Sequence, residues 1–220
     1  MAGAADRATT RIHQLMDPWV AEQPDAPALR DAFVALSYRE LHDASVAAAR
    51  QLQALGLRAG DRLLVVGENC VALGVWVLAA SRLDVWIVVA NARLSGREID
   101  LFIDHAQPRR VLYTPHVSPE AAGHAARHGA ETLDWPGLGR FPVGALNQSA
   151  QPEACSDDAR EQVGCVLYTS GTSGAPKGVM LTHANMMFTA TSAARMRGMT
   201  RDDISYGVLP MAHIVCLTAQ

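Results

Sequence analysis

The sequence predicts an α/β fold in which layered mixed and parallel sheets carry flanking helices. Apolar runs of strand length alternate with amphipathic helical patterns along most of the chain, an order that favours parallel pairing. Helix starts are marked by capping boxes, at Ser37 to Glu40 and at Ser95 to Glu98. The chain has 220 residues, 49% of them hydrophobic, which is enough to bury a substantial core.

The N-terminal region predicts a helix followed by a hairpin. Apolar side chains between residues 12 and 20 have helical spacing, but Pro18 interrupts it. The helix is therefore either kinked or starts afresh with Asp17 as its N-cap. Residues 28–30 and 33–36 are expected to pair as two short strands.

The middle of the chain predicts regular alternation of strands and helices. The helix that begins after Ser37 is expected to stop at Gly56, because glycine adopts the left-handed conformation that ends helices. Glu40 and Glu98 are cap partners rather than acid–base groups, and Trp76 and Trp86 are expected in the core. The elements expected next are a strand at 62–66, a helix at 70–83, a strand at 85–90, a helix from 95 to 105, a strand at 111–113 and a helix at 119–128.

The last third of the chain is less regular. Proline and glycine are dense between residues 134 and 152, so a loop-rich connection is expected there. An apolar strand ending at Tyr168 follows, and Thr182 is expected to cap a helix that runs towards Arg197. Residues 206–209 are expected to form one more strand.

Composition excludes several classes of protein. The net charge is −3, and no basic patch interleaved with aromatic residues suggests nucleic-acid binding. The four cysteines lack metal-binding or disulfide spacing, which indicates reduced thiols in the cytoplasm. Residues 71–92 are the most apolar stretch, but Arg82 and Asp84 at its centre argue against a transmembrane segment.

The richest chemical signal is a short loop of glycine and hydroxyl residues that ends in one lysine. Glycine lets the backbone approach a ligand, and successive N–H groups can then form an anion-binding nest. The hydroxyls can donate further hydrogen bonds, and the lysine adds a positive charge. This composition predicts a phosphate-binding loop made of Thr169, Ser170, Gly171, Thr172, Ser173, Gly174 and Lys177.

The loop differs from the common nucleotide-binding patterns. A Walker A loop counted from Gly171 would need glycine where Pro176 stands. The dinucleotide pattern fails too, because Gly171 and Gly174 are three residues apart. The alternative for Lys177 itself is an exposed surface lysine with no ligand.

The segment from Tyr168 to Val179 closely resembles the signature loop of the AMP-forming, or adenylate-forming, enzymes. Ser173 stands where that family more often has threonine, and the hydroxyl is kept. Residues 36–41 and 88–110 are similar to two earlier family motifs, the second more weakly. Residues 209–213 resemble the Pro-x-x-His segment of the acid–CoA ligase branch, and the resemblance covers nearly the whole chain.

The resemblance implies a two-step reaction. A carboxylic acid, fatty or aryl, reacts with ATP to give acyl-AMP and pyrophosphate, and coenzyme A then displaces AMP. The loop would bind the β- and γ-phosphates, Mg²⁺ would bridge phosphate oxygens, and Lys177 would neutralise pyrophosphate. The match of His213 to its segment implies a place near the acyl and nucleotide pocket, with a structural, hydrogen-bonded histidine as the alternative. His183 is expected to be structural, because a cation is disfavoured at a helix start.

Later motifs of the family are missing from the sequence. We therefore expect residues 1–220 to be an incomplete N-terminal AMP-binding domain, inactive alone, with the C-terminal domain absent; the full-length enzyme could be a homodimer. One alternative is a peptide-synthetase adenylation domain, although Met211-Ala212-His213 stands where that branch usually has Phe-Asp. Another is a catalytically silent nucleotide-binding module. An unrelated kinase or NTPase is disfavoured by the failed Walker pattern.

Overall fold

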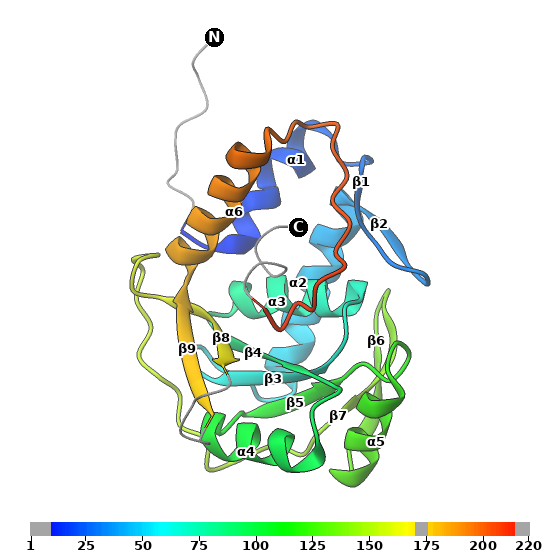
Figure 1. Ribbon diagram of the computed structural model, residues 1–220, viewed down its shortest axis with the longest axis vertical. Helices are drawn as coiled ribbons and strands as arrows, with labels where there is room; N and C mark the ends of the chain where they lie inside the picture. The colour runs from blue at the N-terminus through cyan, green and yellow to red at the C-terminus, as the bar shows by residue number, and fades with distance from the viewer. Residues whose placement is uncertain (1–9, 170–175, 214–220) are drawn as a thin grey trace.

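The protein is built around one seven-stranded mixed sheet with helices on both faces (Figure 1). The computed structural model describes residues 10–169 and 176–213. Four central strands are parallel, and antiparallel strands extend the sheet on both sides. The strand order is β6 (Glu131–Trp135), β7 (Gly139–Val143), β5 (Arg110–Tyr113), β3 (Arg62–Gly67), β4 (Trp86–Asn91), β8 (Val163–Thr169) and β9 (Lys177–Thr182). The predicted fold class is confirmed.

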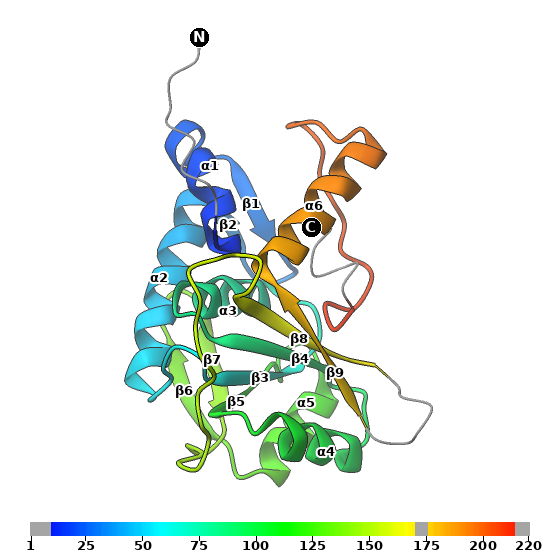
Figure 2. The same ribbon diagram turned by 90° about the vertical axis from the view of Figure 1, so that its left-hand side faces the viewer.

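Helices cover both faces of the sheet (Figure 2). Helices α2 (Tyr38–Ala54) and α3 (Val71–Arg82) lie on one face, and α4 (Gly96–Ala106) and α5 (Pro119–Arg127) on the other. Successive side chains of a strand point to opposite faces, so Leu63 and Val65 of β3 join the first core while Leu64 and Val66 join the second. The central strands are buried on both sides for this reason.

The N-terminal segment restarts at Pro18 rather than bending there. The 3₁₀-helix η1 (Ile12–Met16) ends where α1 (Asp17–Glu22) begins, and the N-cap is Met16 rather than the expected Asp17, which is already helical. Pro18 occupies the first turn of α1, where its missing N–H leaves no helical hydrogen bond unmade. Strands β1 (Pro27–Arg30) and β2 (Ala35–Ser37) then form the expected antiparallel pair.

The two capping boxes expected at Ser37 and Ser95 are confirmed. The Ser37 and Ser95 hydroxyls accept the N–H groups of Glu40 and Glu98, each at 3.3 Å, and those glutamates reach back to the serine N–H groups. Thr182 caps α6 (His183–Arg197) in the same way, with Asn185 as its partner. None of the helices in the described ranges is long and apolar enough to cross a bilayer.

The expected loop-rich connection at 134–152 is wrong in its first half. Strands β6 and β7 form a hairpin there, whose turn contains Gly137 in the left-handed region at φ +76°. Trp135 and Phe141 are buried against Trp76 of α3, with ring centroids 5.4 and 5.0 Å from it. Proline and glycine here mark a tight turn, and the aromatic packing fixes the hairpin. Residues 144–152 carry no strand or helix.

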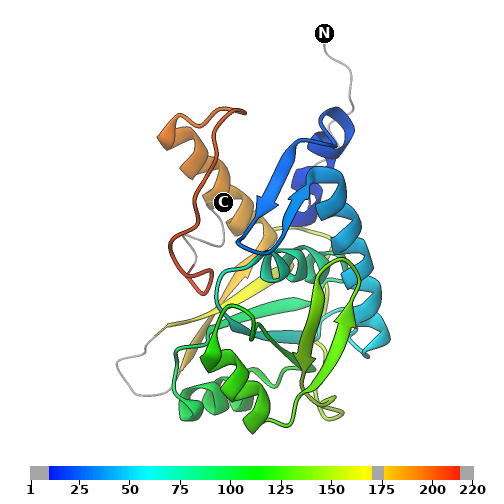
Figure 3. The same ribbon diagram turned by 90° about the vertical axis from the view of Figure 1, so that its right-hand side faces the viewer.

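The expected strand at 206–209 is also wrong. These residues belong to an extended arm, residues 199–213, which runs from the end of α6 back to the sheet (Figure 3). No described strand pairs with the arm, and Tyr206 and Val208 are 88% and 70% exposed. A high β-propensity makes no strand where a partner strand is lacking.

Candidate functional site

The candidate site opens at the carboxyl ends of the parallel strands. Strands β3, β4 and β8 run in the same direction, so their ends meet at one edge of the sheet, which is where open α/β sheets bind ligands. Antiparallel β9 returns from that edge, and its first residue, Lys177, pairs with Thr169. The glycine-rich loop therefore leaves and re-enters the sheet between adjacent strands, with Thr169 and Lys177 exposed at its mouth.

The other predicted loop residues lie outside the described part of the chain. They are Ser170, Gly171, Thr172, Ser173 and Gly174. The structure thus fixes the two ends of the loop, and the ligand contacts of all seven loop residues remain a prediction. Lys177 is the single lysine of the sequence.

Packing behind the loop joins strand β8 to helix α4 and lets β9 lie close to β8. The Tyr168 ring stacks on Phe102 of α4 at 4.1 Å, and its hydroxyl shares a hydrogen bond of 2.7 Å with His105 Nδ1. Burial raises the pKa of Tyr168 to about 12, so this hydroxyl stays protonated. A Cβ atom on Gly178 would come within 2.9 Å of Val166, so glycine is what lets β9 approach β8 here.

His213 lies at the same edge of the sheet, on the arm. Its side chain is exposed, and its N–H donates to the Pro210 carbonyl at 2.9 Å, closing a turn. The turn is tied to Asn69, which follows β3, because the Met211 N–H donates to Asn69 Oδ1 at 2.8 Å. The structure therefore brings the His213 segment to the edge from which the loop emerges (Figure 2).

Asn69 was missed by the sequence analysis. Its neighbour Glu68 forms an ion pair with Arg93 at 2.8 Å, and Glu68 and Arg93 follow β3 and β4, which end at this edge. The one sequence signal for these polar residues was their position just after buried parallel strands. The partners of Asn69 lie too far along the chain for any local pattern to reveal.

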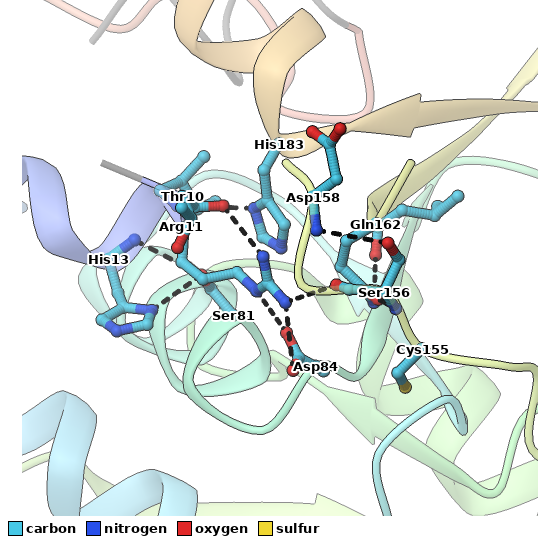
Figure 4. Close-up of polar contacts among 12 residues, drawn as sticks. Thr10, Arg11, His13, Ser81, Asp84, Cys155, Ser156, Asp158, Gln162 and His183 are labelled. Carbon is cyan, nitrogen blue, oxygen red and sulfur yellow. Dashed lines mark hydrogen bonds and ion pairs between the residues drawn. The ribbon is translucent and has the colours of Figure 1, made fainter. Parts of the chain in front are cut away.

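A second missed feature is a buried polar cluster at the opposite ends of the strands (Figure 4). The Arg11 guanidinium pairs with Asp84, which follows α3, and also donates to the Ser156 carbonyl at 2.8 Å. His183 is fully buried beside it, and its Nδ1 accepts the Ile12 N–H at 3.4 Å. Burial, assisted by the Arg11 charge, lowers the pKa of His183 to about 4. The neutral, buried imidazole agrees with the structural role expected for His183.

The described residues contain no group of three or more histidine, cysteine, aspartate or glutamate side chains arranged to hold a metal ion. The three cysteines within those residues, Cys70, Cys155 and Cys165, are free thiols. Of the side chains expected at the site, the structure gives the positions of Thr169, Lys177 and His213.

Comparison with known proteins identifies the class to which this fold and edge belong. The family model for AMP-binding enzymes matches residues 16–220, so the chain belongs to the AMP-binding enzyme family. It is similar to a feruloyl-CoA synthase from an Amycolatopsis species, at 28% identity over 88% of this chain and 38% of the relative. It is also similar to a 2-succinylbenzoate–CoA ligase from Bacillus licheniformis, at 30% identity over 89% of this chain and 39% of the relative.

Solved structures show the same relationship. ATP-bound MatB from Rhodopseudomonas palustris superimposes with a TM-score of 0.72 at 29% identity, over 95% of this chain and 42% of that protein. The o-succinylbenzoate CoA synthetase MenE from Bacillus subtilis, in complex with its acyl-adenylate intermediate, gives 0.70 at 26% identity, over 95% and 52%. The chain spans about two fifths of the length of the curated relatives named here.

Proposed function

We propose that this chain supplies the ATP-binding part of an acid–CoA ligase of the AMP-forming type. The observation that carries the proposal is the glycine-and-hydroxyl loop, which joins two paired strands at the carboxyl edge of the sheet and places Lys177 at its mouth. Membership of the AMP-binding enzyme family and the similarity to an ATP-bound structure support it.

In the first step, a carboxylate oxygen attacks the α-phosphorus of ATP. The bond from that phosphorus to the bridging oxygen breaks, and pyrophosphate leaves with its negative charge. In the second step, the thiol of coenzyme A loses its proton and its sulfur bonds to the acyl carbon, while the bond from that carbon to the phosphate oxygen breaks and AMP leaves. The protein's task in such displacements is to position the reactants and to stabilise the charge that develops.

The loop residues would supply that stabilisation. The backbone N–H groups of residues 170–174 and the hydroxyls of Thr169, Ser170, Thr172 and Ser173 would donate to the β- and γ-phosphates. Lys177 would neutralise the leaving pyrophosphate. Mg²⁺ would be held chiefly by the phosphate oxygens, as is usual for this ion, and would neutralise part of their charge.

For the acid substrate, the proposal names only a chemical class. We propose a fatty or aryl acid, and the names of the feruloyl-CoA synthase and the 2-succinylbenzoate–CoA ligase favour the aryl type. His213 would lie beside the reacting acyl and nucleotide groups, since its turn sits at the same edge. We place the reaction in the cytoplasm, in keeping with the free thiols of Cys70, Cys155 and Cys165.

The test is the affinity for ATP of the Lys177→Ala variant. A charge-assisted hydrogen bond contributes about 1.5–3 kcal/mol, so we expect affinity to fall roughly tenfold to a hundredfold, measured by titration calorimetry with Mg²⁺ present. Arg160→Ala is the control, because it removes an exposed cation that precedes β8 at the opposite edge. If the Lys177→Ala variant and the unaltered protein bind ATP with equal affinity, Lys177 does not contact the phosphates.

A silent nucleotide-binding module is the second candidate. ATP binding without ATP–pyrophosphate exchange, tested in the full-length protein across a panel of aryl and fatty acids, would favour it. Exchange that depends on an amino acid would instead favour the adenylation domain of a peptide synthetase.

A further inference from the structure

The side-chain amide of Asn69 bridges the loop after β3 and the arm. Its Nδ2 donates to the Leu209 carbonyl at 2.7 Å and to the Gly207 carbonyl at 3.0 Å. Its Oδ1 accepts the Met211 N–H at 2.8 Å. One side chain thus satisfies three backbone groups of a segment that is about 140 residues away in the sequence.

The loop that carries Asn69 is itself fixed on both sides. Before it, the Glu68 N–H donates to Thr114 Oγ1 at 3.2 Å, and a Cβ atom on Gly67 would meet that same oxygen at 2.2 Å. After it, the Val71 N–H at the start of α3 donates to Asp31 Oδ2 at 2.8 Å. Asn69 is therefore a preorganised anchor, held between the end of β3 and the first turn of α3.

Within residues 10–169 and 176–213, few other attachments of the arm are present. Ile204 and Tyr206 are 94% and 88% exposed, and Met211 is the single buried side chain between residues 199 and 213. Arg201, at the far end of the arm, pairs with Glu22 of α1 at 2.8 Å. The position of residues 207–213 therefore depends on Asn69 and on the burial of Met211.

His213 lies two residues beyond Met211, in the turn closed by its own N–H and the Pro210 carbonyl. We infer that Asn69 is a positioning residue, which holds this turn, and His213 with it, at the edge of the sheet where the ATP-binding loop emerges. The part of the inference that concerns catalysis rests on the proposed function. The hydrogen bonds that define the anchor are independent of it.

The chemistry of the anchor requires an amide. Two partners are carbonyl oxygens, which need donors, and the third is an N–H, which needs an acceptor. An aspartate of the same shape could accept the Met211 N–H but would set a negative oxygen against two carbonyls. Asn69→Asp therefore tests the donors alone, while Asn69→Ala removes the whole anchor.

The first measurement is amide hydrogen exchange along residues 207–213. We expect exchange at Met211 and His213 to accelerate about tenfold or more in Asn69→Ala, and less at Met211 in Asn69→Asp. The control is Asn147→Ala, which removes another asparagine side chain that accepts a backbone N–H, that of Ser149 at 3.1 Å. Exchange that is unchanged in Asn69→Ala would overturn the inference.

The second measurement is a double-mutant cycle on ATP–pyrophosphate exchange in the full-length protein. Misplacing a group by about 1 Å can cost up to a hundredfold in rate, so Asn69→Ala should lower kcat at least tenfold while leaving KM for ATP within about twofold. The loss should be absent when His213 is already alanine, whereas additive losses would contradict an action through His213. If the unaltered protein shows no exchange, the proposed function fails, and hydrogen exchange still decides whether Asn69 holds the turn.

Discussion

At the scale of single residues, the ion pair of Arg11 and Asp84 illustrates how one contact can offset a local strain. Asp84 has a φ of +53°, in the left-handed region that favours glycine. The Arg11 side chain is only 10% exposed and needs a partner for its charge. The carboxylate of Asp84 supplies that partner, so the strained backbone and the buried cation are accommodated together.

Removing the carboxylate should therefore destabilise the fold. We expect Asp84→Ala to lower the free energy of unfolding by about 2–3 kcal/mol, because Arg11 loses its counter-ion in a largely buried site. Asp84→Gly should lower it by about 1 kcal/mol less, since glycine adopts this φ without strain. Urea denaturation measures both, and Asp43→Ala, at a carboxylate 70% exposed on α2, serves as the control. Equal losses in the two Asp84 variants would show that the backbone is unstrained.

Residue pairs of this kind are what the sequence could not reveal. The spacing of Ser37 and Glu40 predicts a capping box because both partners lie within one helical turn. Arg11 and Asp84 are 73 residues apart, and no local pattern links them. Asn69 is hidden for the same reason, since a single asparagine after a strand is typical of any loop.

At the scale of elements, a helix or strand was predicted correctly where the contacts that stabilise it lie within a few residues in the sequence. Helices with capping boxes began where expected. The hairpin of β6 and β7 was missed because its stability comes from packing on Trp76, about 60 residues earlier in the chain. The strand expected at 206–209 does not form, because a strand needs a neighbouring strand to pair with, and the composition of the segment cannot show whether one is there.

The junction of β9 and α6 depends on a tightly packed histidine. A Cβ atom on Gly164 of β8 would lie 2.8 Å from the His183 ring, so strand and imidazole are in direct contact. His13 of η1 lies nearby, and its backbone N–H donates to Ser81 Oγ at 3.3 Å. Burial, with the Arg82 charge, lowers the pKa of His13 to about 4, as burial does for His183.

These histidines should make the fold sensitive to mild acid. Each has a folded-state pKa of about 4, below its ordinary value of 6.5, so the unfolded state binds protons first as pH falls. Their contribution to stability is complete above pH 6.5 and is lost between there and pH 4. Between about pH 7 and pH 5, the unaltered protein should lose about 1–2 kcal/mol more than His183→Gln, measured by urea denaturation. Parallel pH profiles for the two proteins would contradict a neutral, buried His183.

At the scale of the whole molecule, the alternation of strands and helices was sufficient to predict a mixed α/β sheet covered on both faces. Parallel pairing of the central strands follows from that alternation, and it brings the ends of β3, β4 and β8 to one edge. The motif from Tyr168 to Val179 predicted a phosphate-binding loop, and the paired strands that bear its two ends place that loop at this edge. The attachment of the arm to that edge depends on tertiary contacts such as those of Asn69, which no local pattern reveals.

The central claim, that the loop ending at Lys177 binds the phosphates of ATP, is tested most directly by the reactivity of that lysine. Lys177 carries the single ε-amino group of these 220 residues and is exposed, so amine acylation followed by mass spectrometry can report on it alone. With saturating ATP and Mg²⁺, we predict that its acylation slows by roughly tenfold or more, because phosphate oxygens engage the ammonium group. The N-terminal amine should serve as the unchanged internal reference. Bound ATP that leaves the acylation rate of Lys177 unaltered would contradict the account.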